Sequence, residues 1–273
     1  MGRISRSFQL IGQSWKVLMK DPELLVLPLL SGICIVIVTL SFIVPMGFLQ
    51  EGAIEEANEV VVYGVVFLFY VVTYTLSFFF QAAVVAGATE RMRGGDPTVG
   101  SSLRAAASRF PALLMWGVIA ATVGMILKAI EERSGVVGKI VVSLLGAAWS
   151  LATFFMVPVL VMERLPVGQS FKRSWAIFKQ TWGETVVGSL GIGLLTFLGM
   201  LVIGAIGFGL FYIQLEVVAI VTCIAGFLLL MLVSSALGGV YTAAMYRYAT
   251  EGPDADTGFD AELLASAYRQ KKK

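Results

Sequence analysis

Long apolar runs, separated by short polar segments, dominate the pattern of hydrophobic and polar positions along the chain. Six of these runs reach about 20 residues or more, the length that a helix needs to cross a hydrocarbon core about 30 Å thick. They lie at about residues 24–48, 60–88, 111–129, 136–162, 185–211 and 216–246. Lipid offers no partners to the backbone, which favours helices, and the alternating ten-residue strands of a membrane barrel are not seen in the sequence. The pattern predicts an all-α, polytopic membrane protein with six transmembrane helices.

The polar segments before the first, third and fifth runs carry a helical pattern of their own. Apolar residues recur there at helical spacing, and most basic residues fall outside the apolar stripe. The stripes are Ile4, Phe8, Ile11, Trp15 and Leu18 in the first segment and Val167, Phe171, Trp175, Phe178 and Trp182 in the third. The middle segment is weaker because Ala105 to Ala107 add little apolar area. We expect three cytoplasmic-side amphipathic interfacial helices, at about residues 3–20, 98–110 and 167–182, with bases among the lipid headgroups and rings beneath them.

The same three segments align with one another. Residues 11–16, 99–104 and 167–172 each read as a β-branched residue, Gly, a polar residue, Ser, a large apolar residue and a base, and two apolar runs follow each of them. Self-similarity of this kind predicts three pseudo-repeats. Chance likeness among Ser-, Gly- and Lys-rich loops is the alternative, and a second register pairs Ser14-Trp15 with Ser174-Trp175.

The distribution of Lys and Arg predicts an orientation. Seventeen of the 20 basic residues fall in the N-terminal segment, in the loops after the second and fourth runs, and in the C-terminal tail. The loop from Gln50 to Glu59 holds four Glu and no base. Because bases concentrate on the cytoplasmic side, we predict a multi-pass protein of the cell (inner, cytoplasmic) membrane with both termini cytoplasmic. Residues 1–250 would form a single membrane domain and residues 251–273 a cytoplasmic tail. The first run is too long, at about 25 residues, for a cleaved signal peptide.

Composition narrows the chemistry. Of the 273 residues, 58% are hydrophobic and 14% are charged, with a mean hydropathy of +0.85, which excludes an ordinary soluble domain, a disordered chain and a nucleic-acid binder. The chain has no His, so no Ser-His-Asp triad or HExxH zinc site can form. Cys34 and Cys223 lie in apolar runs and are expected to pack as small apolar side chains. The sequence predicts a protein that is not an enzyme and holds no cofactor or metal.

Two groups of charged residues are candidate sites at the membrane surface. The first, a set of candidate contacts for anionic lipid, is Arg3, Arg6, Lys16, Arg104, Lys172, Arg173 and Lys179. The second, expected to form interfacial ion pairs, is Glu90, Arg91, Glu163 and Arg164, where even-numbered spans end. For the first group, a role in topology and in packing of short helices against the bundle is the favoured interpretation, and lipid binding is the alternative. Glycines crowd the fifth run, where close helix packing and a hinge are both open.

A family resemblance rests on longer stretches of sequence. Pro158 to Glu163, followed by Gly168 to Trp182, looks like an uncharacterised prokaryotic family of six-span integral membrane proteins. Ser7-Phe8 through Ser14-Trp15-Lys16 to Pro28, and the tail from Phe259 to Leu264, resemble it too. The unit of one amphipathic helix and two spans is distantly similar to the membrane domain attached to some glycerophosphodiester phosphodiesterases. The resemblance implies architecture but no catalytic residue and no activity.

We therefore expect a non-enzymatic membrane scaffold, or a subunit that interacts with lipid or with a partner. Its partners would be membrane lipids, and either a second copy or another membrane protein, without nucleic acid. The alternative is a transporter or channel for a neutral or lipid-like solute. Ionisable side chains are scarce inside the apolar runs, which argues against ion-coupled transport. An intramembrane enzyme is the least supported reading because no activated nucleophile is visible.

Overall fold

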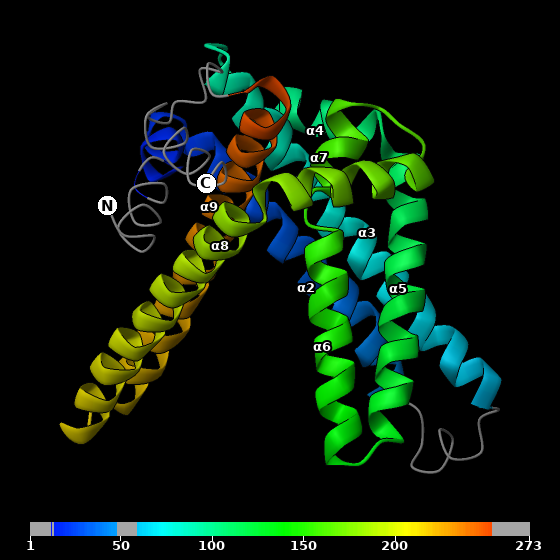
Figure 1. Ribbon diagram of the computed structural model, residues 1–273. Helices are drawn as coiled ribbons and strands as arrows, with labels where there is room; N and C mark the ends of the chain where they lie inside the picture. The colour runs from blue at the N-terminus through cyan, green and yellow to red at the C-terminus, as the bar shows by residue number, and fades with distance from the viewer. Residues whose placement is uncertain (1–11, 13, 48–58, 253–273) are drawn as a thin grey trace. The chain divides into compact units, whose positions relative to one another are not determined.

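A computed structural model of the protein describes residues 12, 14–47 and 59–252 (Figure 1). Regular structure in these ranges is helical throughout. The elements are η1 (Pro22–Leu25), α2 (Val26–Gly47), α3 (Glu59–Met92), α4 (Val99–Ala107), α5 (Phe110–Glu132), α6 (Val136–Ala152), α7 (Met156–Met162), α8 (Val167–Tyr212) and α9 (Glu216–Glu251). Residues 14–20 are helical as well.

Six stretches are long and apolar enough to cross a membrane, which confirms the expected number of spans. They are Pro22–Val44, Val60–Met92, Phe110–Glu132, Val136–Met162, Thr185–Tyr212 and Glu216–Glu251. The second and sixth continue past their predicted ends at residues 88 and 246, so that Arg91 and Arg247 belong to helices rather than to loops. The chain is a membrane protein by this criterion.

Contacts divide the chain into two compact units, each built from separate stretches of sequence. Unit 1 comprises residues 1–28, 87–99 and 179–273, and unit 2 comprises residues 29–86 and 100–178. Helix α8 contributes to both, because the division falls between Phe178 and Lys179.

A chain of aromatic rings joins four helices of unit 2. Phe78 of α3 lies 6.1 Å from Trp116 of α5, measured between ring centroids. Trp116 stacks on Trp149 of α6 at 5.6 Å, and Trp149 stacks on Phe171 of α8 at 5.9 Å. Ring pairs at such distances are stabilising beyond the area that they bury. Trp116, which is 3% exposed, is the centre of this core.

The fourth span is broken between α6 and α7, whereas the sequence predicted one run over 136–162. Pro158 has no N–H, so the carbonyl of Phe154 loses its usual helical donor and the helix is interrupted just before it. Ser174 of α8 bridges the interruption. Its Oγ accepts a hydrogen bond from Phe155 N–H at 3.2 Å and donates one to the carbonyl of Ala152 at 2.9 Å. A buried serine on a later helix therefore satisfies two backbone groups that the break exposes.

In unit 1, glycines bring α8 and α9 close together, and Figure 1 shows the two helices running side by side. A Cβ built on Gly199 would lie 2.8 Å from Leu230, and one on Gly226 would lie 3.2 Å from Ile203. A hydrogen bond of 2.8 Å joins the hydroxyls of Thr196 and Ser234 across the pair. These glycines serve packing, and α8 is a continuous helix through the glycine-rich stretch.

Of the three segments expected to form separate interfacial helices, two are short helices in the structure and one is part of a long helix. The described part of the first, residues 14–20, is helical, and α4 covers the middle segment. The third is not a separate helix, because α8 runs without a break from Val167 to Tyr212. Gly183 follows the predicted end at Trp182, but the helix continues through it. Residues 3–11 and 13, and the tail after 252, lie outside the described part of the chain.

Candidate functional site

A group of basic side chains gathers at one end of unit 2. We call it the basic end, and it comprises Arg104, Arg109, Arg164, Lys172 and Arg173 with one carboxylate, Glu163. Arg104 lies in the last turn of α4, Arg109 directly precedes α5, and Glu163 and Arg164 follow α7. Lys172 and Arg173 belong to the second turn of α8. Hydrogen bonds of Arg109 and Arg173 join α5 and α8 to the end of α7 within this group.

Arg109 fastens α5 to the segment that follows α7. Its Nε donates to the carbonyl of Leu160 at 3.0 Å, and its Nη2 donates to the carbonyl of Leu165 at 3.1 Å. Carbonyls near the end of a helix lack intrahelical donors and carry partial negative charge, so a guanidinium is a favourable partner. Arg109 is half-buried, and the carbonyl dipoles stabilise its charge.

The remaining bases differ in whether a carboxylate is paired with them. Arg173 Nε contacts both carboxylate oxygens of Glu163, at 2.9 and 3.1 Å. Arg104, Arg164 and Lys172 are exposed, and within the described ranges we find no carboxylate paired with them. Arg164 has a φ of 53°, a left-handed conformation that is uncommon outside glycine and that occurs in the turn between α7 and α8.

The chemistry available at the basic end is the binding of anions. Guanidinium and ammonium groups are donors without an acceptor function, and they match phosphate oxygens in geometry and charge. Five bases against one carboxylate leave an excess of positive charge that the backbone contacts of Arg109 only partly balance. At the opposite end of unit 2, the bases Lys128, Arg133 and Lys139 lie where α5 ends and α6 begins, together with Glu131 and Glu132.

Unit 1 has a polar network of a different kind, in which guanidinium groups are paired with carboxylates. Arg91 Nε lies 3.7 Å from Asp21 Oδ2, and its Nη1 lies 3.4 Å from Asp96. Arg91 Nη2 also donates to the carbonyl of Lys20 at 3.2 Å. Gly94, with a φ of 82°, ends α3 in a left-handed turn that brings the following residues back to Arg91.

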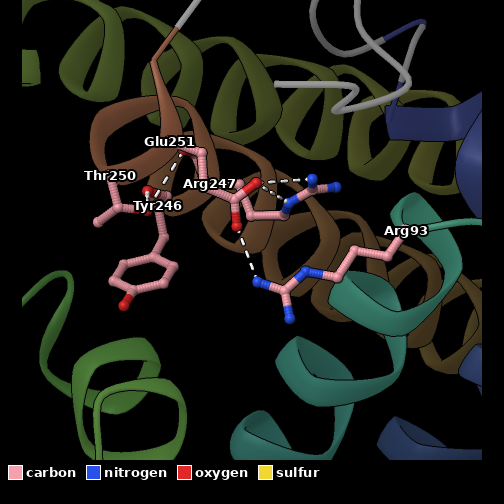
Figure 2. A network of polar contacts seen from close by, with 5 residues as sticks. All are labelled: Arg93, Tyr246, Arg247, Thr250 and Glu251. Atoms are coloured by element: carbon pink, nitrogen blue, oxygen red, sulfur yellow. Dashed lines mark hydrogen bonds and ion pairs between the residues drawn. The ribbon is translucent and has the colours of Figure 1, made fainter. Parts of the chain in front are cut away.

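Figure 2 shows the second part of this network, where α3 and α9 end. The Glu251 carboxylate receives Arg93 Nη2 on one oxygen at 2.8 Å and Arg247 Nη2 on the other at 2.7 Å. The side chain of Arg247 is 6% exposed, whereas that of Arg93 is 56% exposed. The ion pair between Arg247 and Glu251 is therefore the more desolvated of the two. The Glu251 carboxylate offsets part of the cost of burying the Arg247 charge.

Replacing Glu251 by glutamine is expected to destabilise unit 1 by about 1–2 kcal/mol, because a buried guanidinium loses its counter-charge while Glu251 itself is partly solvated. Arg93→Gln, which removes a largely exposed partner, is the matched control and should cost less than about 1 kcal/mol. The free energy of unfolding in detergent, followed by circular dichroism, measures both. Equal losses in the two variants would contradict the assignment of Arg247 as the dependent partner.

Asp21 makes the stability of unit 1 depend on pH. Burial raises the pKa of its carboxyl above the ordinary 3.8, Arg91 opposes this rise, and the neighbouring acids add to it: Asp96, Glu23 and Glu90. The folded state then holds the proton more tightly than the unfolded state. The resulting stability is fully present below pH 3.8 and is lost as the pH rises through the raised pKa.

The variant Asp21→Asn removes this titration. Its unfolding free energy relative to the wild type is expected to increase as the pH is raised from about 3 to about 7, because only the wild type must ionise a buried carboxyl. Chemical unfolding at several pH values measures the difference. A variant that loses stability relative to the wild type over this range would show that attraction to Arg91 outweighs burial.

The candidate residues from the sequence fall into several environments. Arg3 and Arg6 lie outside the described residues. Lys16, Arg104, Lys172 and Lys179 are exposed, and Arg173 is engaged by Glu163. Of the second group, Arg91 pairs with Asp21 and Asp96, and Glu163 pairs with Arg173. Arg164 has no carboxylate partner among the residues described.

Several residues of these clusters were not anticipated from the sequence. Arg109 and Ser174 act on backbone groups, and Asp21, Arg93 and Glu251 act in ion pairs between segments far apart in the chain. The one signal in the sequence was Pro158 within an apolar run, which implies backbone groups in need of a partner. Among the described residues, no group of three or more Cys, Asp or Glu side chains is arranged to hold a metal ion.

Comparison with known sequences gives a family but no function. Residues 60–259, well over half of the chain, match a family described as a family of unknown function, DUF6159. No curated protein shows significant similarity to the chain.

Proposed function

Since the chain belongs to the DUF6159 family, whose function is unknown, we propose that it is a non-enzymatic membrane scaffold that binds anionic phospholipid at its basic end. The observation that supports this proposal is a difference in charge pairing between the arginine network of unit 1 and the basic end of unit 2. In unit 1, Arg91, Arg93 and Arg247 are paired with carboxylates of the protein. In unit 2, the basic end presents exposed bases without internal counter-charges, beside helices that are long enough to span a bilayer.

The orientation follows from the same charges. Bases of membrane proteins concentrate on the cytoplasmic side, so the basic end lies at the inner leaflet of the cell membrane, and both termini are cytoplasmic. Anionic lipids of that leaflet attract each nearby base with about 1 kcal/mol. The exposed bases of the basic end are in place for such contacts.

The proposal includes the three pseudo-repeats. Ser14, Ser102 and Ser170, which occupy the same repeat position, are 0%, 1% and 0% exposed. The bases two positions later are all exposed: Lys16, Arg104 and Lys172. This shared alternation supports a common unit in which the serine packs against the protein and the base is directed to the membrane surface. The distant likeness to phosphodiesterase membrane domains stays a prediction.

Exchange of lipid in nanodiscs tests the function. In the triple variant Arg104→Gln, Arg164→Gln and Lys172→Gln, we expect the preference for phosphatidylglycerol over phosphatidylcholine to fall roughly 100-fold, since three bases are lost. Native mass spectrometry of retained lipid measures this preference.

The matched control removes three exposed bases from the other end of unit 2: Lys128, Arg133 and Lys139. This control variant should keep the preference of the wild type for the anionic lipid. A basic-end variant that retains the wild-type preference, or a control that loses as much, would overturn the proposed function.

A further inference from the structure

The helix over residues 14–20 has two unlike faces. Ser14, Val17 and Leu18 are 0%, 6% and 1% exposed and form the face that packs on the protein. On the opposite side, Trp15 is 43% exposed and Met19 is 60% exposed. These two side chains are four residues apart and therefore lie above one another on the helix.

Two lysines border this exposed apolar pair. Lys16 and Lys20 are also four residues apart, both are exposed, and each follows one of the two apolar residues in the sequence. The helix thus presents an apolar stripe next to a basic stripe. Among the described residues, no carboxylate is paired with either ammonium group.

The two stripes line a surface groove. It is an open hollow of about 410 Å³, and the described residues that line it are Trp15, Lys16, Val17, Met19 and Lys20. The walls combine an aromatic ring and a thioether, suited to an acyl chain or a glycerol backbone, with two ammonium groups suited to a phosphate.

The position of the groove along the chain indicates its surroundings. The first apolar stretch begins at Pro22, immediately after the helix. Only Asp21 separates this helix from η1, which begins at Pro22, and Asp21 N–H donates a hydrogen bond to the Leu18 carbonyl at 3.2 Å. Residues 14–20 therefore lie directly at the end of the first span. Tryptophan at the end of a span is typical of the interface between headgroups and acyl chains.

We infer that this groove is a site for one anionic phospholipid. The phosphate lies between Lys16 and Lys20, and the start of the acyl chains lies against Trp15 and Met19. The inference rests on the proposed function, because it places the chain among anionic lipids, but it assigns a separate site in unit 1 that does not use the residues of the basic end.

A fluorescent probe at the groove tests the inference in the full-length protein. A single cysteine replaces Met19 in a background with Cys34→Ala and Cys223→Ala, and it carries a bimane label in nanodiscs. Quenching is measured with phosphatidylglycerol or phosphatidylcholine whose acyl chains are brominated near the glycerol. Two lysines predict roughly a 30-fold preference for phosphatidylglycerol.

Variants of Lys16 and Lys20 then test whether the lipid preference depends on their positive charge. Lys16→Gln with Lys20→Gln should bring the preference close to unity, and Lys16→Arg with Lys20→Arg should preserve it. An excess of inorganic phosphate should leave quenching by the lipid unchanged. Equal quenching by the two lipids in the wild-type sequence would overturn the inference, and so would displacement by phosphate, which would indicate a site for the free ion.

This result is distinguishable from failure of the proposed function. The basic-end variants should lose lipid retention while the probe at position 19 keeps its preference for phosphatidylglycerol. If retention depends on the basic end but the probe shows no preference, the groove site is wrong and the proposed function stands. If the probe shows the preference while the basic-end variants retain lipid normally, the proposed function is wrong and the groove site stands.

Discussion

The variant Ser174→Ala is expected to destabilise the protein by about 2–5 kcal/mol, because a buried backbone N–H and a part-buried carbonyl lose their partner at once. The Ser174 hydroxyl accepts from Phe155 N–H and donates to the Ala152 carbonyl, which lie on either side of the break between α6 and α7. Ser174 and Phe155 are both 0% exposed, so water does not replace the hydroxyl. Thermal unfolding in detergent, followed by circular dichroism, measures the loss.

Ser150→Ala is the matched control for this prediction. The Ser150 hydroxyl donates to the carbonyl of Gly146 within the continuous part of α6, at 2.9 Å, and Ser150 is exposed. That carbonyl keeps its helical backbone partner when the hydroxyl is removed, so the change should stay within about 0.5 kcal/mol. If Ser174→Ala unfolds at the same temperature as Ser150→Ala, the break in the fourth span is not held by Ser174.

Replacing Gly117 by leucine is expected to cost about 3 kcal/mol or more, because helices α3 and α5 are in contact at this glycine. Any Cβ at position 117 would overlap Thr75 Oγ1, and it would approach the backbone N and Cα of Thr75 to 3.2 and 3.3 Å. The Thr75 hydroxyl can rotate, but the backbone of α3 cannot move without displacing the helix. The unfolding free energy of the purified variant in detergent is the measurement.

Gly64→Leu on α3 is the control, since nothing lies within 4 Å of a Cβ there and the residue is exposed. It should leave stability unchanged or raise it slightly, as leucine is the better helix former. Gly117→Ala in a Thr75→Ala background should lose less than Gly117→Ala alone, since the two sites are coupled. Equal effects at positions 64 and 117 would contradict close packing of α3 on α5.

The number and positions of the spans could be predicted because apolar length is a property of the local sequence. Each predicted run corresponds to one of the six apolar stretches. The local pattern did not show which residue of another helix each position in these runs contacts. The sequence did not indicate that Thr75 faces Gly117 or that Ser174 serves the break before Pro158.

The amphipathic segments illustrate the same limit. The periodicity placed Trp15 and Leu18 on one apolar stripe, yet Leu18 is 1% exposed and Trp15 is 43% exposed. In the third segment Phe178 is buried while Trp175 is exposed, and the buried face includes Ser170. A helix that lies between protein and lipid has apolar surroundings on both sides. Residue type alone therefore does not show which apolar side chains face the protein and which face the lipid.

The ion pairs depended on contacts between distant segments. Asp21 and Arg91 are 70 positions apart, and Arg93 and Glu251 are 158 apart. The positions of Lys and Arg along the sequence predicted an orientation but did not indicate which bases would pair with carboxylates of the protein. That distinction separates the paired network of unit 1 from the basic end of unit 2.

The measurement that tests the central claim most directly is photo-crosslinking of the wild-type protein in liposomes that contain a phosphatidylglycerol with a photoreactive group near its phosphate. Peptide mass spectrometry then locates the adducts. Binding of anionic lipid at the basic end predicts adducts in residues 100–110 and 163–178, in clear excess over those formed with the matching phosphatidylcholine. Adducts confined to residues 128–139, or equal labelling by the two lipids, would contradict the proposal.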